Sequence, residues 1–178
     1  MGGDHGPPVC VRGALLASQR IPGLHFQLHG DEAQIEAELA RMPALRPLVQ
    51  IVHADRAIAM DEKPAQAMRR GKGTSLWGAV EAVKTGEASA VVSAGNTGAL
   101  MAISKLQLRM AADLERPAIV ASWPTARGMS VVLDVGANVT SDAEQLVEFA
   151  IMGAAFHRAV HGSTRPTVGL LNVGSEEQ

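Results

Sequence analysis

The sequence predicts an α/β protein in which helices cover both faces of a mostly parallel sheet, and three observations support this fold class. Short apolar runs alternate along the chain with segments whose apolar residues recur at helical spacing. Runs such as AVV, SVVL and VGLL are almost continuously apolar, which is typical of strands covered on both faces. Of the 178 residues, 47% are hydrophobic, which is enough for a sizeable core. We therefore expect one layered domain over residues 1–178.

The strands are predicted where apolar residues alternate with polar ones or run without interruption. These segments are 24–30, 48–54, 88–94, 117–123, 129–135 and 167–173. The first helix is predicted at 8–20, with Val11, Leu15 and Leu16 on its apolar face. The later helices begin at caps or after glycine: at Asp31, at Thr74 or Ser75, at Thr97 (to about Met110), and at a capping box of Ser141 and Glu144, ending near His161. Residues 55–73 are the least regular stretch.

Composition excludes several classes of protein. The net charge of −2 and the sparse aromatics, with two Trp, three Phe and no Tyr, argue against a nucleic-acid partner. The single cysteine, Cys10, excludes an internal disulfide framework and fits a reducing compartment. We interpret Cys10 as a packing residue inside the first helix. The chain shows neither a signal-peptide pattern nor a long apolar run, so we expect a soluble cytoplasmic protein.

Three apolar runs end in the same way, as VVSAGNTG, VVLDVGAN and GLLNVGSEE. Each predicted strand finishes in a small or polar residue and is followed by glycine and by hydrogen-bonding side chains. The carboxyl ends of parallel strands share one edge of a sheet, and helix N-termini at that edge attract phosphate. Glycine that serves only the turns is the alternative for any one of these motifs. The three together with MGGDHGP favour an anion site, so we expect Gly3, Asn96 and Asn138 to surround one cleft.

Gly95, Asn96, Thr97 and Gly98 begin a predicted helix, and we expect them to bind phosphate or a developing oxyanion. A helix cap at Asn96 or Thr97 is the alternative. In the glycine-flanked loop GGDHG, His5 is expected to donate to phosphate or to transfer a proton, the alternative being a plain surface histidine.

The remaining candidates are polar residues at strand ends and a basic cluster. Asp134, Asn138 and Asn172 are expected to shape the edge of the site. Because a carboxylate beside an anion is unfavourable, Asp134 is expected to orient backbone N–H groups. The cluster Arg69, Arg70 and Lys72 faces either phosphate or an acidic partner protein, or is a solvated loop. GKGTS does not match the phosphate-binding loop of nucleotide hydrolases, because glycine follows Lys72 and the first glycine of that pattern is missing.

The motifs GGDHGP, SAGNTGALM, LDVGAN, AIMG and GLLNVGSE, in this order, resemble the bacterial phosphate acyltransferase family, the acyl-ACP:phosphate transacylases of phospholipid synthesis. The likeness extends over all 178 residues, with two departures. The family has a strand immediately before MGGDHGP, and it continues well beyond GSEE. The resemblance thus implies that the chain is the N-terminal half of such an enzyme without its first strand. We expect residues 1–178 alone neither to fold stably nor to be active.

The resemblance implies a fold similar to that of isocitrate dehydrogenase, a homodimer, and transfer of a fatty acyl group from acyl carrier protein to inorganic phosphate. It implies no cofactor and no metal, and a cytoplasmic enzyme with possible peripheral contact at the inner face of the membrane. Direct attack by phosphate requires positioning and oxyanion stabilisation rather than a protein nucleophile. The catalytic candidates are His5, Asn96 and Thr97. The phosphate-binding candidates are Gly2, Gly3, Asp4, Ser93, Gly95, Gly98, Asp134, Asn138 and Asn172.

Two rival classes of function stay open at this point. One is a CoA-dependent phosphotransacylase or an NAD-dependent decarboxylating dehydrogenase of the same kind of fold. The dehydrogenase requires an acidic metal cluster, which the sequence does not show. The other is a non-catalytic module that binds a carrier protein or a membrane surface. Formation of acyl phosphate from acyl-ACP and phosphate distinguishes these classes.

Overall fold

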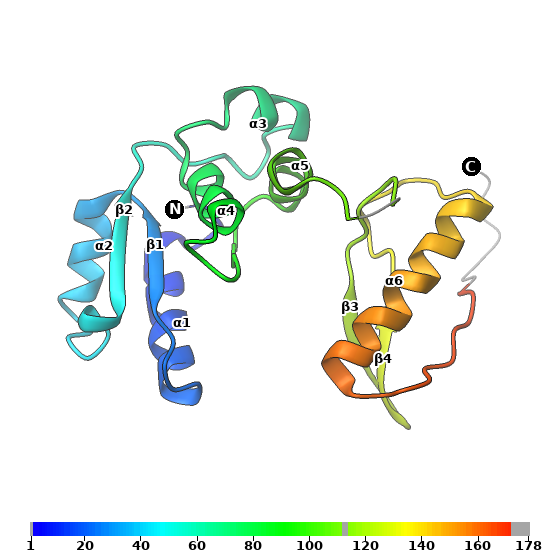
Figure 1. The fold of residues 1–178 in the computed structure, drawn as a ribbon. Helices are drawn as coiled ribbons and strands as arrows, with labels where there is room; N and C mark the ends of the chain where they lie inside the picture. Colours follow the sequence, from blue (N-terminus) through cyan, green and yellow to red (C-terminus); the bar gives the residue numbers. More distant parts are fainter. Residues whose placement is uncertain (1, 112–113, 172–178) are drawn as a thin grey trace. The chain divides into compact units, whose positions relative to one another are not determined.

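The computed structural model describes residues 2–111 and 114–171, and it is of α/β type (Figure 1). Contacts between residues divide the chain into two compact units, 1–109 and 110–178. Unit 1 contains α1 (Gly6–Arg20), β1 (Phe26–Gly30), α2 (Glu32–Leu39), the 3-10 helix η1 (Arg46–Leu48), β2 (Val49–His53), α3 (Pro64–Arg70), α4 (Ser75–Thr85) and α5 (Thr97–Leu108). Unit 2 contains β3 (Ala121–Thr125), β4 (Gly128–Val132) and α6 (Ala143–His161). The expectation of one domain over the whole chain stays a prediction.

Unit 1 is built on a small parallel sheet in which β1 pairs with β2 and Leu28 lies opposite Ile51. α1 and α2 cover the face of the sheet that carries these side chains. The core between them consists of Val11, Ala14, Ile35, Leu39, Leu45 and Val49. On the opposite face, α4 packs so closely that a Cβ at Gly78 would lie 3.0 Å from Nδ1 of His29. The helices therefore enclose β1 from both faces, as the apolar runs predict.

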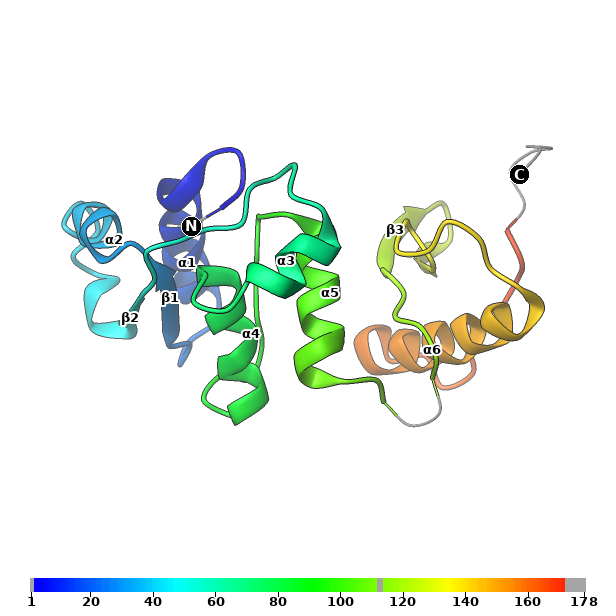
Figure 2. The same ribbon diagram turned by 90° about the horizontal axis from the view of Figure 1, so that it is seen from above.

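A second core joins α3, α4 and α5, which lie together in Figure 2. Its buried members are Ile58, Ala67, Leu76, Val80, Ala99 and Ile103. α4 begins at the predicted cap, because the Thr74 hydroxyl accepts a hydrogen bond from the N–H of Trp77. α3 was not predicted from the sequence, although Pro64 at its first turn is a known signal of a helix start.

Residues 88–94 were predicted to be a strand, and this prediction is wrong for the structure. They form no ladder, and Val92 is 96% exposed. A cavity of about 120 Å³ is lined on one side by Gln27, Leu28 and His29 of β1 and on the other by Val92, Ser93 and Ala94. Among the described residues β1 pairs only with β2, and this cavity lies between β1 and the segment, so the segment forms no ladder with it.

Unit 2 differs from the expected parallel arrangement, because β3 and β4 form an antiparallel hairpin. β3 begins at Ala121 rather than at residue 117, and the Thr125–Gly128 turn directs the chain straight back. α6 packs beside β4, where a Cβ at Gly153 would meet Leu133 at 3.0 Å. Residues 167–171 were also predicted to be part of a strand but form none, whereas 172–173 lie outside the described residues.

Three smaller expectations are also corrected. The capping box of α6 is formed by Asp142 and Gln145, one residue after the predicted pair Ser141 and Glu144. Leu16 is 46% exposed, because Val11 and Ala14 turn the buried face of α1 toward α2. Cys10 is exposed rather than packed in the core. No helix within the described ranges is long and apolar enough to cross a membrane.

Candidate anion-binding site

The glycine-rich loop before α1 lies directly against the segment before α5. A Cβ added to Gly3, whose φ is +80°, would lie 2.6 Å from the carbonyl oxygen of Ala94. A Cβ at Gly2 would lie 3.8 Å from Cα of Gly95 and 3.9 Å from the carbonyl oxygen of Ile58. Only glycine permits both this backbone conformation and this close approach. The structure therefore brings together two of the motifs that the sequence analysis selected.

The N-terminus of α5 has backbone donors available beside this contact. The N–H of Ala99 donates to Oδ1 of Asn96, and the N–H of Gly95 donates to Oγ of Ser93 at 3.1 Å. The N–H groups of Thr97 and Gly98 make no hydrogen bond to any residue in the described ranges. These free donors and the positive end of the helix dipole suit an anion. His5 and Asp4 are exposed in the adjoining loop, where His5 precedes the first turn of α1.

Asn96 is buried and its NH₂ group is already engaged in hydrogen bonds, unlike the NH₂ group of a free catalytic donor. It is 7% exposed, and its Oδ1 accepts from the N–H of Ala99 at 2.9 Å. Its Nδ2 donates to the carbonyl oxygens of Ala59, Met60 and Glu62 at 3.0, 3.0 and 2.8 Å. The alternative that Asn96 caps the helix is confirmed, and the same side chain also holds the loop before α3.

The basic cluster lies along α5 rather than at its N-terminus. α3 runs beside α5, with Pro64 against Gly98 at one end and Gly71 against Ile103 at the other. Arg69, Arg70 and Lys72 are exposed at the Gly71 end, about one and a half helical turns from Gly98. The phosphate contact and the partner-protein contact of the cluster both stay predictions.

Two further basic residues escaped the sequence analysis. Lys63 is the cap residue of α3. It directly precedes Pro64, the residue that packs against Gly98. Arg56 donates from Nη2 to the carbonyl oxygen of Lys72 at 2.6 Å and extends the basic cluster. The start of α3 at Pro64 was the signal that would have drawn attention to Lys63.

In unit 2, Asp134 orients the backbone of the loop after β4. Its Oδ1 accepts from the N–H groups of Ile119 and Ala137 at 2.8 and 3.0 Å. Its Oδ2 accepts from the N–H and Nδ2 of Asn138 at 2.7 and 3.0 Å. These contacts agree with the expected role of Asp134. Gly3 and Asn96 belong to unit 1 and Asn138 to unit 2, so their shared cleft stays a prediction, and Asn172 lies outside the described residues.

Asp134 makes the stability of this loop depend on pH. Burial acts to raise the pKa of Asp134, but the hydrogen bonds from Ile119, Ala137 and Asn138 outweigh it and lower the pKa below its ordinary value of 3.8. The stabilisation is therefore present above the ordinary pKa and is lost as pH falls through the lowered one. We expect Asp134→Asn to reduce the urea midpoint at pH 7 and to flatten its decrease between about pH 5 and pH 2. An unchanged acid limb in the variant would show that other carboxylates govern it.

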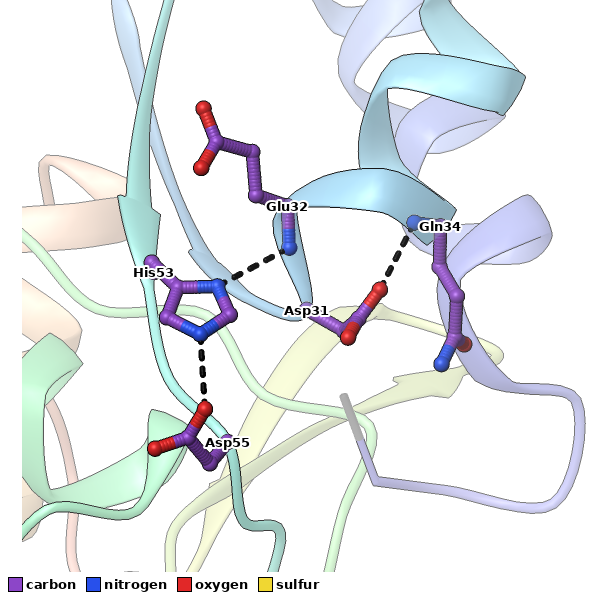
Figure 3. A network of polar contacts seen from close by, with 5 residues as sticks. All are labelled: Asp31, Glu32, Gln34, His53 and Asp55. Carbon is purple, nitrogen blue, oxygen red and sulfur yellow. Dashed lines mark hydrogen bonds and ion pairs between the residues drawn. The ribbon is translucent and has the colours of Figure 1, made fainter.

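A polar network that was not predicted from the sequence lies at the carboxyl ends of β1 and β2 (Figure 3). Nδ1 of His53 accepts from the N–H of Glu32 at 3.2 Å, so Nε2 carries the proton and donates to Asp55 at 2.8 Å. The hydrogen bond with Asp55 raises the pKa of His53. Asp31 caps α2 beside it, as predicted, by accepting from the N–H of Gln34. Because both ring nitrogens are engaged, the network fixes the start of α2 and offers no free base.

Comparison with known proteins identifies the family of the chain. The model of a family described as fatty acid synthesis protein matches residues 1–178. The chain belongs to this family. The resemblance to phosphate acyltransferases that the motifs indicate is confirmed. Proteins named phosphate acyltransferase from Caulobacter vibrioides and Phenylobacterium zucineum are 71% and 67% identical to it.

The alignments with these relatives cover this member of the fatty acid synthesis protein family almost completely, but they cover only about half of each relative. The alignments include 100% and 99% of the chain, and 49% and 51% of the Caulobacter and Phenylobacterium proteins. A phosphate acyltransferase from Parvibaculum lavamentivorans, 54% identical, shows the same relation, with 99% and 49% covered. The chain thus spans about half the length of the curated relatives that it matches.

Proposed function

We propose that the whole enzyme transfers a fatty acyl group from the thioester of acyl carrier protein to inorganic phosphate, giving acyl phosphate for phospholipid synthesis. The observation that carries this proposal is the contact between the Gly2–Gly3 loop and the Ala94–Gly95 segment. That contact sets the free N–H groups of Thr97 and Gly98 beside a glycine-rich loop. The names of the relatives supply the chemistry that these donors suit.

The proposed reaction needs few protein groups. A phosphate oxygen attacks the thioester carbonyl carbon, the carbon–oxygen bond forms, and negative charge develops on the carbonyl oxygen. The carbon–sulfur bond then breaks, and the sulfur leaves with the electron pair as a thiolate that takes up a proton. Thiols have a pKa of about 8.5, so this group leaves without a strong acid. Orientation of phosphate and stabilisation of the oxyanion provide the rate enhancement.

The residues take separate roles in this proposal. The N–H groups of Thr97 and Gly98 bind phosphate or the oxyanion, and Gly2, Gly3 and Gly95 allow the backbones to approach. His5, exposed next to this loop, donates to phosphate or accepts a proton, and Asp4 and Ser93 line the loops. For Asp134, Asn138 and Asn172, the expectation that they shape the edge of the site stays a prediction. Asn96 acts through the backbone that it holds.

The wider architecture is part of the same proposal. The parallel pair β1–β2 with helices on both faces supports a sheet similar to that of isocitrate dehydrogenase. In α6, Val147 and Ile151 are each 60% exposed, which supports a homodimer in which this apolar face is covered. We place the enzyme in the cytoplasm, with peripheral contact at the inner face of the membrane and no bound cofactor.

The proposal is tested by mixing the whole enzyme with acyl-ACP and inorganic phosphate and by measuring acyl phosphate, trapped as hydroxamate, together with the released thiol. Equal amounts of both products, dependent on phosphate, are expected. Acyl-CoA in place of acyl-ACP tests the phosphotransacylase alternative. Binding of acyl-ACP without phosphate-dependent thiol release would indicate a non-catalytic module instead.

The basic cluster is expected to attract the acidic carrier protein. Reversing charge with Arg69→Glu and Arg70→Glu should raise KM for acyl-ACP about tenfold at low salt, because exposed charges mainly change the rate of encounter. The KM for phosphate should stay unchanged, because these residues lie away from the N-terminus of α5. Steady-state kinetics at two salt concentrations check this prediction. The exposed cations Arg12 and Arg20 of α1 provide matched charge-reversal controls, and equal effects there would remove the cluster from the docking surface.

A further inference from the structure

The carbonyl oxygens of Ala59, Met60 and Glu62 converge on the side-chain amide of Asn96 at the N-terminus of α5. We infer that Asn96 is a positioning residue that strengthens phosphate binding by holding this loop and by satisfying its three carbonyl oxygens. The inference rests on the proposed function and gives Asn96 a role other than oxyanion donor.

The hydrogen bonds of Asn96 leave its NH₂ group no donor capacity for phosphate or an oxyanion. An amide group has two donor hydrogens and one oxygen. Both hydrogens are shared among three carbonyl oxygens at 2.8–3.0 Å, and the oxygen accepts from the N–H of Ala99 at 2.9 Å. The side chain is almost completely buried, at 7% exposure. Asn96 therefore influences the reaction through the backbone that it fixes.

The loop that Asn96 holds is connected to both sides of the candidate site. Immediately before it, the carbonyl oxygen of Ile58 lies 3.9 Å from the position of a Cβ at Gly2. Two residues after it, Cγ of Pro64 lies 2.8 Å from the position of a Cβ at Gly98. Movement of the loop would thus be transmitted to the glycine loop and to the first turn of α5.

The three carbonyl oxygens also matter electrostatically. Each carries a partial negative charge, and each lies within 3.0 Å of Nδ2 of Asn96, the cap of the helix end where the proposal puts an anion. The NH₂ group of Asn96 offsets this charge, because it presents its positive hydrogens to all three oxygens. Without that group the oxygens would be unsatisfied or would turn toward the anion, and both outcomes weaken phosphate binding.

Asn96→Ser separates this role from helix capping. Serine is as good a helix cap as asparagine, but its short hydroxyl cannot reach three carbonyl groups. We expect KM for phosphate to rise about tenfold, the effect of losing roughly 1.4 kcal/mol of binding free energy. The turnover rate and the KM for acyl-ACP should stay within about threefold of the wild type, and amide hydrogen exchange should accelerate at residues 59–62. Asn96→Asp, which keeps the cap but places a carboxylate against the carbonyl groups, should raise KM for phosphate further.

The control for a plain loss of stability is Asp31→Ala, which removes a cap of the same kind from α2, where Asp31 accepts from the N–H of Gln34 at 2.8 Å. It should lower Tm without changing KM for phosphate. Calorimetric titration of each whole enzyme with inorganic phosphate gives the same comparison as Kd, independently of turnover.

The outcomes separate the two levels of the proposal. A wild-type enzyme that binds phosphate but forms no acyl phosphate refutes the proposed function, and the ratio of Kd values between Asn96→Ser and wild type then decides the inference alone. Unchanged phosphate affinity in Asn96→Ser overturns the inference. A turnover rate that falls by about 100-fold or more while KM for phosphate stays unchanged also overturns it, because that result marks an oxyanion donor.

Discussion

Gly3→Ala is expected to lower kcat/KM for phosphate about 100-fold, because a shift of about 1 Å in a positioning loop has effects of this size. The added Cβ would lie 2.6 Å from the carbonyl oxygen of Ala94 and 3.1 Å from its carbonyl carbon. These are backbone atoms, so the side chain cannot avoid them by rotation. The Gly2–Gly3 loop must therefore move away from the segment that leads into α5. Steady-state kinetics of the whole enzyme measure the effect.

Gly23→Ala is the matched control for this variant. Gly23 has a φ of +84°, close to the +80° of Gly3, but nothing lies within 4 Å of the position of its Cβ. Both variants carry the strain of alanine in a left-handed conformation, about 1–2 kcal/mol. Only Gly3→Ala adds the steric conflict. If both variants lose activity equally, contact between the two loops is not what the site requires.

Ile103→Ala is expected to have the largest effect on stability, a loss of about 2–5 kcal/mol in the free energy of unfolding. Ile103 is fully buried on α5 among the residues that join α3, α4 and α5. Removing its side chain leaves a cavity that three packed helices cannot fill without moving. Because a domain is stabilised by only about 5–15 kcal/mol, a large part of unit 1 should unfold at moderate urea concentrations.

The control lies one turn further along the same helix. Leu106 is 53% exposed, so Leu106→Ala should change the urea midpoint far less. Circular dichroism reports the transitions, together with tryptophan fluorescence, to which Trp77 contributes because it packs against this core. Similar losses for the two variants would contradict the placement of α5 between α3 and α4.

The elements that the sequence predicted correctly are those with local signals. Asp31 and Thr74 cap helices where their side chains accept from nearby N–H groups, and the helix after Gly95 follows from the same short-range rule. The strand predicted at 88–94 failed because a strand depends on a partner, and hydrophobicity does not state which backbone is adjacent. For the same reason the sequence did not reveal that β3 and β4 pair as an antiparallel hairpin.

In the candidate site, too, features with local signals were predicted and contacts between distant segments were not. The glycines of the two loops were recognised because a close backbone approach requires glycine. The position of Asn96 at the start of α5 was also predictable. Its contact with residues 59–62, more than thirty positions earlier, was not, because no local pattern links an asparagine to distant carbonyl groups. Lys63 was overlooked together with α3, whose initial proline is a local signal.

The central claim, that phosphate binds where the Gly2–Gly3 loop meets the N-terminus of α5, is tested most directly by NMR titration of the whole enzyme labelled with ¹⁵N-glycine and ¹⁵N-threonine. Inorganic phosphate is added and the amide signals are followed. We predict saturable shifts at Thr97 and Gly98, with smaller shifts at Gly2 and Gly3, and no shift at Gly23. Saturable shifts confined to other amides, or no saturable shift at Thr97 and Gly98, would contradict the account.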